Sequence, residues 1–410
     1  MDQTLLVFIL VYLVMGLGIL PGFKVDRTGA AVVGMLAMIV IGSISGKEAW
    51  IAIDYTTIGL LFGLMVVSST FAISGFYGWA SMKLATLDIK PSFLVAVFII
   101  VGAVLSSILT KDVVAVAMVP LLISVTMVRS LNPVPFLLAF CFAVNTGSTS
   151  TLIGSPQNMI AAQTLGMSFN NFLKAAAVPA LLSLPIVWGA IVLIYRGRWQ
   201  LPNMAKTDKP ILKQPELDRL EMAKALIVTF AVILAFVFSD WPHEIIALAA
   251  ASVLLISRKI SSKDVLKEVD IDLLLLISGL FVVNAAIAKT GLPQDLLGHL
   301  RSMGLDLNDP LSLYLVGGIL SNLVGNNPAV MLLVPYINTS IDVDALGAAL
   351  VLGTGFSSNL IIFGSLAGII TVEHASSAGI KISFIEFFRA GAVVTMLSMV
   401  MAGFWIYWIT

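Results

Sequence analysis

The chain has 410 residues, of which 59% are apolar and only 11% are charged, so it cannot be a water-soluble globule. Its formal net charge is zero, which gives no sign of a nucleic-acid partner. At about 20 residues per transmembrane helix this length holds roughly ten to twelve spans, which predicts an all-α integral membrane protein surrounded by the lipid bilayer.

The first half of the chain is a series of apolar segments. It passes from Met-Asp-Gln into an apolar segment without the basic stretch of a signal peptide, so we expect a retained span. Cys141 is the only cysteine, cannot form an intrachain disulfide, and is expected to be a small core residue. The apolar segments of this half cover residues 5–20, 29–45, 56–72, 91–104, 113–128, 135–162 and 175–195.

A polar stretch then separates the first series from a second one. Residues 196–224 carry seven basic and four acidic side chains together with three prolines, which is typical of a solvated linker. The apolar segments after it cover residues 225–238, 245–256, 273–288, the two arms around Asn326, 346–371 and 390–408. We therefore predict three parts: a first repeat over residues 1–195, a cytoplasmic linker over 196–224 and a second repeat over 225–410.

The two halves keep register with one another, which is how an internal repeat is recognised. The matching positions form three blocks. In the first block, Asp54, Gly63, Leu64 and Gly75 match Asp270, Gly279, Leu280 and Gly291, and in the second block, Leu105, Ser106 and Pro120 match Leu320, Ser321 and Pro335. In the third block, Ser168, Phe169 and Phe172 match Ser383, Phe384 and Phe387. Chance does not produce three matching blocks, so the halves are predicted to share one architecture.

Each half contains a polar tip between two apolar arms. The first tip reads Ser-Ser-Ile-Leu-Thr-Lys-Asp at residues 106–112, and the second reads Ser-Asn-Leu-Val-Gly-Asn-Asn at residues 321–327. A charged side chain at bilayer depth costs at least about 2.5 to 3.5 kcal/mol, so Lys111 and Asp112 are expected to face a partner or a watery cavity. We interpret each tip as the turn of a re-entrant hairpin, which enters and leaves by the same face of the membrane.

The positions of the basic residues favour one topology. With one hairpin per half, each half crosses the membrane five times and the two repeats have opposite orientations. If the linker is cytoplasmic, 18 of the 23 Lys and Arg residues lie on the cytoplasmic side, four lie outside, and Lys111 lies in the membrane, in agreement with the positive-inside rule. We therefore expect a multi-pass protein of the cell inner (plasma) membrane with both termini outside.

An apolar segment interrupted by polar residues follows each hairpin. The interruptions lie at residues 145–158 and 353–365. Irregular backbone at membrane depth persists only where protein buries it or a cavity adjoins it, and hairpins with broken helices form the midplane site of many secondary transporters. The hydroxyl and amide side chains suit a small polar or ionic solute. The alternative is that they only hold helices together.

The run Asn-Thr-Gly-Ser-Thr-Ser-Thr-Leu-Ile-Gly-Ser-Pro-Gln-Asn at residues 145–158, preceded by a Thr-Lys-Asp hairpin that ends at Pro120, resembles the ion transporter superfamily. That group contains arsenite permeases, sodium/proton antiporters of the NhaD type, citrate-metal carriers and divalent anion/sodium symporters. The resemblance spans nearly the whole chain. It implies two inverted-topology repeats, each with five transmembrane helices, a re-entrant hairpin and one broken helix, and an elevator-like motion of this core against a scaffold that forms a homodimer.

Carried over position by position, the resemblance implies a substrate site built from both hairpins and both broken helices. The hairpin residues are Thr110, Lys111, Asp112, Asn322, Asn326 and Asn327. The broken-helix residues are Asn145, Thr146, Gly147, Ser148, Gly154, Pro156 and Asn158 in the first half and Gly353, Thr354, Gly355, Ser357, Ser358 and Asn359 in the second.

Lys111 departs from the family pattern, because arsenite permeases and their antiporter relatives usually have Asn at this position. We hypothesise that the ammonium replaces a sodium ion and that Lys111 and Asp112 together load and release a proton, so that transport is coupled to protons. Two other interpretations stay open. Lys111 could be permanently charged and attract an anionic substrate, or it could form a static ion pair that only stiffens the hairpin.

These features favour a secondary active transporter of a small inorganic anion or oxyanion, with arsenite or antimonite efflux as the leading case. A sodium/proton antiporter is the first alternative, although Asp112 is the only carboxylate deep in a span. A dicarboxylate or sulfate symporter is the second, although no cluster of Arg marks such a substrate. An enzyme is not expected, since neither a nucleophile–base pair nor a metal-ligand pattern is visible, and we expect no metal and no cofactor. The chain has no Walker motif, so any ATPase would be a separate cytoplasmic subunit.

Overall fold

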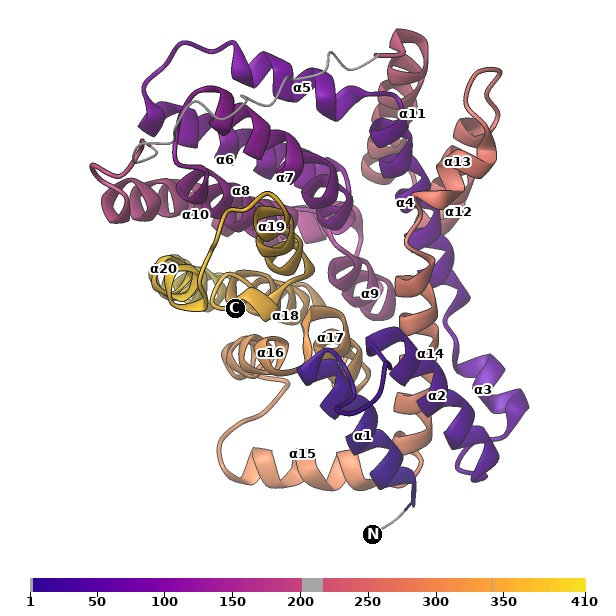
Figure 1. The fold of residues 1–410 in the computed structure, drawn as a ribbon. Coiled ribbons are helices and arrows are strands. Elements are labelled where there is room, and N and C mark those ends of the chain that lie inside the picture. The colour runs from indigo at the N-terminus through magenta and orange to yellow at the C-terminus, as the bar shows by residue number, and fades with distance from the viewer. Residues whose placement is uncertain (1–2, 201–216, 341) are drawn as a thin grey trace.

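The computed structural model describes residues 3–200, 217–340 and 342–410 (Figure 1). Within these ranges the regular structure is helical, with two isolated β-bridges and no β-strand. Residues 201–216, the larger part of the predicted linker, lie outside the described residues. The end of that predicted linker is helical, because α11 begins at Arg219, directly after the capping residue Asp218.

The described residues of the first half form a continuous series of helices. They are α1 (Gln3–Leu17), α2 (Arg27–Val40), α3 (Gly46–Ala52), α4 (Tyr55–Ile73), α5 (Phe76–Ala85), α6 (Pro91–Ile108), α7 (Lys111–Val128), α8 (Pro133–Ser148), the 3₁₀ turn η1 (Leu152–Gly154), α9 (Pro156–Leu165) and α10 (Phe169–Ile194).

The second half repeats this order of elements closely. Its elements are α11 (Arg219–Phe238), α12 (His243–Leu255), α13 (Ser262–Lys267), α14 (Ile271–Ala288), α15 (Leu292–Ser302), α16 (Pro310–Val324), α17 (Asn326–Leu333), η2 (Val334–Tyr336), α18 (Val343–Ser357), η3 (Ile362–Gly364), α19 (Leu366–Ser377) and α20 (Phe384–Ile409).

Helix caps account for two of the blocks that repeat between the halves. Asp54 and Asp270 are the N-caps of α4 and α14, and the carboxylate of each accepts a hydrogen bond from a backbone N–H group of the first turn. Ser168 and Ser383 cap α10 and α20 in the same way, through their hydroxyl oxygens. The repeated polar residues therefore mark the starts of equivalent helices.

Close helix packing accounts for two repeated glycines. Gly63 lies where α4 packs on α12, and a Cβ there would come within 2.5 Å of the Ala247 backbone. Gly279 lies where α14 packs on α2, and a Cβ there would come within 2.7 Å of the Ala31 carbonyl oxygen. Small residues let membrane helices approach closely, so both contacts require glycine for the same reason.

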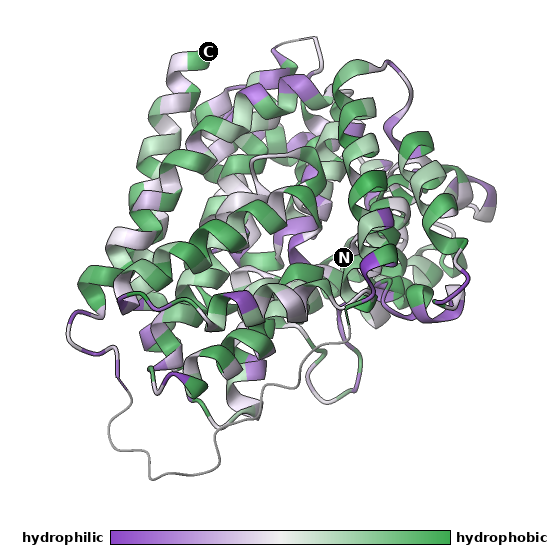
Figure 2. Ribbon diagram, turned by 90° about the horizontal axis from the view of Figure 1, so that it is seen from above, coloured by the Kyte–Doolittle hydropathy of each residue, from purple (hydrophilic) through white to green (hydrophobic). Residues whose placement is uncertain are grey.

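The helices are those of a multi-pass membrane protein. Among the described residues, seven helices are long and apolar enough to cross a membrane, and six further apolar helices are shorter. Figure 2 shows hydrophobic residues along most helices and hydrophilic residues mostly at helix ends and in loops. The seven candidate spans are α4, α6, α7, α10, α11, α14 and α20.

Two groups of helices lie side by side in Figure 1. The flanking group contains α2, α4, α12 and α14, in which α2 packs on α14 and α4 packs on α12. The central group contains α6–α10 and α16–α20, in which α6 packs on α8 and α16 packs on α18. The groups meet where α4 contacts α7 and α9 and where α14 contacts α17, so the polar tips at the starts of α7 and α17 lie in elements that border both groups.

Candidate functional site

Two helix pairs turn at the predicted polar tips. In the first pair α6 is followed by Leu109 and Thr110, and the Thr110 backbone N–H donates to Ser68 Oγ of α4 at 3.1 Å. In the second pair the turn between α16 and α17 is Gly325, whose φ of 93° lies in the region that favours glycine. The free N–H groups at the starts of α7 and α17 are therefore located at the two tips.

The helices α8 and α18 end inside the predicted polar runs. α8 stops at Ser148 and α18 at Ser357, and each is followed by a 3₁₀ turn before the next helix begins. Gly154 permits the first break, because a Cβ there would come within 2.1 Å of the Ser148 carbonyl oxygen. Asn158 holds this break from the side, with Nδ2 donating to the carbonyl oxygens of Ser148 at 2.7 Å and Thr151 at 2.8 Å.

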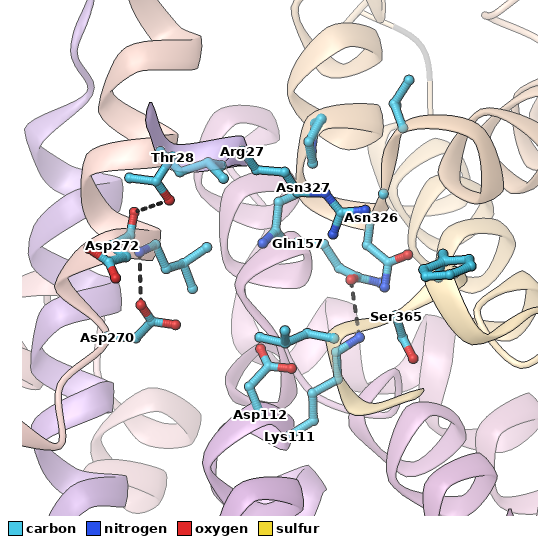
Figure 3. A pocket seen from close by; sticks show the side chains of 18 residues that line it. Arg27, Thr28, Lys111, Asp112, Gln157, Asp270, Asp272, Asn326, Asn327 and Ser365 are labelled. Atoms are coloured by element: carbon cyan, nitrogen blue, oxygen red, sulfur yellow. Dashed lines mark hydrogen bonds between the residues drawn. The ribbon is translucent and has the colours of Figure 1, made fainter. Parts of the chain in front are cut away.

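A cavity of about 210 Å³, called the first cavity below, lies between both tips, the second helix break and the starts of α2, α9 and α14. It takes residues from the central group and from the flanking group (Figure 3). Its polar and charged lining residues are Arg27, Thr28, Lys111, Asp112, Gln157, Asp270, Asp272, Asn326, Asn327 and Ser365.

Neutral oxygen atoms hold the ammonium group of Lys111. The residue is 3% exposed, and Nζ donates to Gln157 Oε1 at 3.3 Å. In the orientation in which Asn326 Nδ2 donates to the Gly364 carbonyl oxygen at 2.8 Å, its Oδ1 accepts from Lys111 Nζ at 3.1 Å. The first hairpin tip is thereby joined to the second.

Asp112 points to a different part of the cavity from Lys111 (Figure 3). The four ion pairs within 4.0 Å among the described residues all lie elsewhere, so the two side chains do not form a static pair in this structure. Asp112 Oδ1 is buried and has no hydrogen-bond partner in the described structure. A buried acceptor in this condition is costly unless water, a proton or a ligand completes it.

Arg27 brings a second positive charge to the first cavity. It is the first residue of α2, and its Nε donates to the Met15 carbonyl oxygen at 2.9 Å, which leaves the terminal guanidinium nitrogens available. Figure 3 shows the side chain extending from α2 toward Asn326 and Asn327. Two cations from different helix groups therefore line one cavity together with three carboxylates, Asp112, Asp270 and Asp272, so an anion is attracted to the side formed by Lys111 and Arg27 and not to the cavity as a whole.

A second cavity of about 410 Å³ adjoins the first one. Asp112 and Asp270 line both cavities, and Thr110, Tyr77 and Glu268 line only the second. The Thr110 hydroxyl and the Tyr77 hydroxyl are buried and have no hydrogen-bond partner among the described residues. The second cavity thus contains polar atoms that require a partner from solvent.

Several broken-helix residues bond to one another across the two halves. Asn145 Nδ2 donates to Asn359 Oδ1 at 3.1 Å and to Ser365 Oγ at 2.9 Å. Asn359 Nδ2 donates in turn to Thr146 Oγ1 at 3.1 Å. Because these side chains are buried, the bonds form one polar network between α8 and the second helix break.

The structure separates the predicted site residues into two sets. Residues of the first set line a cavity. The first cavity is lined by Lys111, Asp112, Asn326 and Asn327, and the second cavity is lined by Thr110, Asp112 and Pro156. The others lie outside these two linings, and several support them: Thr354 Oγ1 accepts from Gln157 Nε2 at 3.4 Å, for example. This second set comprises Asn145, Thr146, Gly147, Ser148, Gly154, Asn158, Asn322, Gly353, Thr354, Gly355, Ser357, Ser358 and Asn359.

Sequence reasoning did not place Arg27, Gln157 or Asp270 among the site residues. Gln157 could have been found, because it lies within the polar run at 145–158. In the sequence, Asp270 is recognisable only as half of a repeated pair with Asp54. Arg27 carries no local signal, since a basic residue at the end of an apolar segment is ordinarily a topology determinant.

Comparison with known proteins places the chain among transporters. The family described as "Citrate transporter" (CitMHS) matches residues 10–355. A 46 kDa membrane protein of Mycobacterium leprae is 27% identical over 98% of this chain and 97% of its own length. The silicon efflux transporter LSI3 of Oryza sativa subsp. japonica is 33% identical over 40% of this chain and 33% of its own length.

A solved structure shares the fold. The crystal structure of the Alcanivorax borkumensis YdaH transporter, described as having an unusual topology, superimposes with a TM-score of 0.61 and covers 100% of this chain and 98% of that one. The sequence identity is 16%, so this similarity concerns the fold alone.

Proposed function

The chain belongs to the citrate transporter family, CitMHS, and we propose that it is a proton-coupled secondary active transporter of a small oxygen-bearing anion. We further propose that it works by alternating access of the elevator type. Small inorganic oxyanions are the leading substrates, and arsenite and antimonite belong to this class in their deprotonated, anionic forms.

The environment of Lys111 is the observation that carries this proposal. Its ammonium is buried, touches only the neutral oxygens of Gln157 and Asn326, and has no carboxylate within 4.0 Å in the described structure. A buried charge is strongly unfavourable unless it is paired. An anion in the first cavity would supply the missing charge, and the amide group of Asn327 would donate to its oxygens.

Asp112 is the proposed carrier of the coupling proton, acting beside Lys111. Its unpartnered Oδ1 lies in the wall shared by both cavities, so a proton on Asp112 lies close to the anion without occupying its place. Binding of an anion to Lys111 and binding of a proton to Asp112 both reduce uncompensated charge. The two events are therefore expected to favour one another, which is the requirement for coupling.

In the proposed topology, the chain consists of two inverted repeats, each with five membrane crossings and one hairpin. The linker would lie in the cytoplasm and both termini would lie outside. The central group would move against the flanking group, which would also form the homodimer contact. This is supported by the composition of the first cavity, because Lys111, Gln157 and Asn326 belong to the central group whereas Arg27 and Asp270 come from the flanking side. A cavity built from both groups changes when one slides past the other.

Inorganic oxyanions lead the substrate list because the first cavity is small, and because amides dominate its polar wall near Lys111. The name of the silicon efflux relative favours an inorganic solute. A di- or tricarboxylate is the second candidate. The family name favours it, and Arg27 places a second cation in the cavity, which answers the objection that the sequence shows no Arg cluster.

The test is uptake into proteoliposomes that contain the purified protein, with an inward proton gradient and a panel of arsenite, antimonite, silicate, sulfate, phosphate, succinate and citrate. Binding is measured in parallel, because a ligand at 100 times its Kd raises the free energy of unfolding by about 2.7 kcal/mol. Proton-driven uptake of one oxyanion or carboxylate is expected. A protein that is stabilised only by sodium or lithium, and that moves none of the panel, would refute the proposal in favour of sodium/proton antiport.

A further inference from the structure

The first and second cavities meet at two carboxylates. Asp112 of α7 and Asp270, the N-cap of α14, line both cavities, and Figure 3 shows their side chains across the first cavity from one another. The first cavity contains both cations, Lys111 and Arg27, whereas the second contains neither. The wall between them is therefore acidic, with the anion-attracting groups on one side only.

The second cavity has a largely apolar lining with a few polar atoms that can bind water. Three buried oxygens that face it have no hydrogen-bond partner among the described residues: Thr110 Oγ1, Tyr77 Oη and Asp112 Oδ1. Thr110 and Tyr77 are each 2% exposed, and buried polar groups in folded proteins almost always have a partner. With about 410 Å³ available, the cavity has room for several water molecules that bridge these oxygens. Its lining includes Glu268, which is exposed, so water in the cavity would reach the surface at this residue.

Comparison of the two repeats separates Asp270 from its counterpart Asp54. Among the described residues, one carboxylate oxygen of Asp270 has no hydrogen-bond partner, whereas both carboxylate oxygens of Asp54 have one. Asp54 Oδ1 accepts from the backbone and side chain of Thr56, and its Oδ2 accepts from the Thr57 hydroxyl at 2.6 Å. Asp270 Oδ1 accepts from the Leu273 backbone N–H at 2.9 Å, and Oδ2 has no partner in the described part of the chain. Both aspartates cap a helix, but only Asp270 has an oxygen available for a second task.

We propose that Asp270 relays protons between the water of the second cavity and Asp112, so that the proton reaches the site by a route that the anion does not use. This inference rests on the proposed function in one respect, namely that Asp112 carries the coupling proton. In the inward step, protonated Asp270 gives its proton through water to the Asp112 carboxylate. The Asp270 carboxylate is then protonated again by a hydronium ion from the Glu268 side, which leaves a neutral water molecule, and the reverse sequence releases the proton.

The surroundings of Asp270 suit such a relay. Burial raises the pKa of its carboxyl above the ordinary value, so this carboxyl holds a proton more readily than an exposed aspartate does. The charged and titratable groups that face the two carboxylates are Lys111 on α7, Arg27 on α2, Tyr77 on α5, Glu268 before α14 and Asp272 on α14. The two cations lie on the anion side, so neither interrupts the water path from Glu268.

The experiment measures the protonation of Asp112 directly, without any substrate. Purified protein in lipid nanodiscs is subjected to a rapid drop in pH, and the growth of the carboxylic acid C=O infrared band is recorded. The band of Asp112 is identified as the one that Asp112→Asn removes. Asp270→Asn keeps the helix cap, because the Asn side-chain oxygen also accepts from the first turn. Asp54→Asn is the matched control, since it makes the same change at the equivalent cap.

Protonation of Asp112 is expected to slow by at least about tenfold in Asp270→Asn, since a positioned acid–base group typically contributes roughly 10²- to 10⁴-fold, and to keep its wild-type rate in Asp54→Asn. An unchanged rate in Asp270→Asn overturns the relay. A wild-type protein without any titrating Asp112 band overturns both the relay and the proton coupling. If no solute of the panel is transported but the slowing is found, the proposed substrate class fails and the relay stands.

Discussion

The ammonium nitrogen of Lys111 lies 3.3 Å from Oε1 of Gln157. Gln157 is itself fixed from the other half of the chain, because its Nε2 donates to Thr354 Oγ1 at 3.4 Å. The position of the buried charge therefore depends on a contact between residues that are 197 positions apart. Any motion that separates the two helix breaks would also shift Lys111, which is how substrate binding and conformation can be connected.

Replacing Lys111 with Met should weaken anion binding without unfolding the protein. A hydrogen bond to a charged group contributes about 1.5 to 3 kcal/mol, so the apparent affinity should fall roughly 10- to 150-fold. Removing a buried charge often leaves stability unchanged or raises it. The measurement is the shift in unfolding temperature caused by the panel solutes, together with the unfolding temperature of the variant alone.

Lys47→Gln provides the control for this prediction. Lys47 is an exposed residue of α3, so the variant loses the same unit of charge far from the first cavity. Its ligand-induced shifts should equal those of the wild type. If Lys111→Met keeps the wild-type affinity and transport rate, Lys111 neither binds the anion nor takes part in coupling.

Asp112→Asn should separate anion movement from proton movement. The amide cannot carry a proton at neutral pH, so uptake driven by a pH gradient should be lost. Exchange of labelled for unlabelled solute at equal concentrations needs no net proton transfer and should continue at a rate within a few-fold of the wild type. Both rates are measured in the same proteoliposomes. Loss of exchange together with uptake would mean that Asp112 is needed for folding or anion binding instead.

Gly147→Ala should destabilise the contact between α6 and α8. A Cβ at this position would come within 2.4 Å of Ala103 Cα, a backbone atom that cannot rotate away. Overpacking of this kind costs typically about 1–3 kcal/mol, which SDS titration in mixed micelles can resolve. Gly189→Ala in α10 is the control, because nothing lies within 4 Å of its added Cβ. The control should be neutral or slightly stabilising, and equal effects of the two substitutions would contradict the packing argument.

The class of the protein could be predicted from composition, and its superfamily from one polar run. The family match and the apolar helices confirm both. The sequence also predicts where the helices break, because glycine, hydroxyl and amide residues do not belong on a lipid-facing helix. Both breaks lie inside the predicted polar runs at 145–158 and 353–365. These features are local, so the sequence around them is sufficient to locate them.

The identity of the cavity residues could not be predicted in the same way. Asn145 and Asn326 are both polar residues in apolar surroundings, yet Asn145 bonds to Asn359 whereas Asn326 faces the first cavity. The difference arises from packing between segments that are far apart in the chain. Arg27 was missed for the same reason, because only the contact between α2 and α14 brings the start of α2 to the cavity.

Arg27 offers the test that separates the two substrate classes. Its guanidinium faces the first cavity across from Lys111, so an anion with two separated charges can contact both cations, whereas a singly charged oxyanion needs only Lys111. Arg27→Gln should therefore weaken the binding of citrate, succinate or sulfate by roughly 10- to 150-fold, which is the effect of losing one hydrogen bond to a charged group. The binding of singly charged solutes should change by much less.

Two further variants make the Arg27 result specific. Lys24→Gln removes the same charge from an exposed residue just before α2 and should leave every affinity unchanged, because exposed charges are screened by salt. Arg27→Lys keeps the charge but loses the planar fork, and should recover part of the affinity for the multiply charged solutes. If Arg27→Gln weakens all solutes equally, the residue acts on the shape of the cavity through its bond to Met15, and the transported anion is one that contacts Lys111 alone.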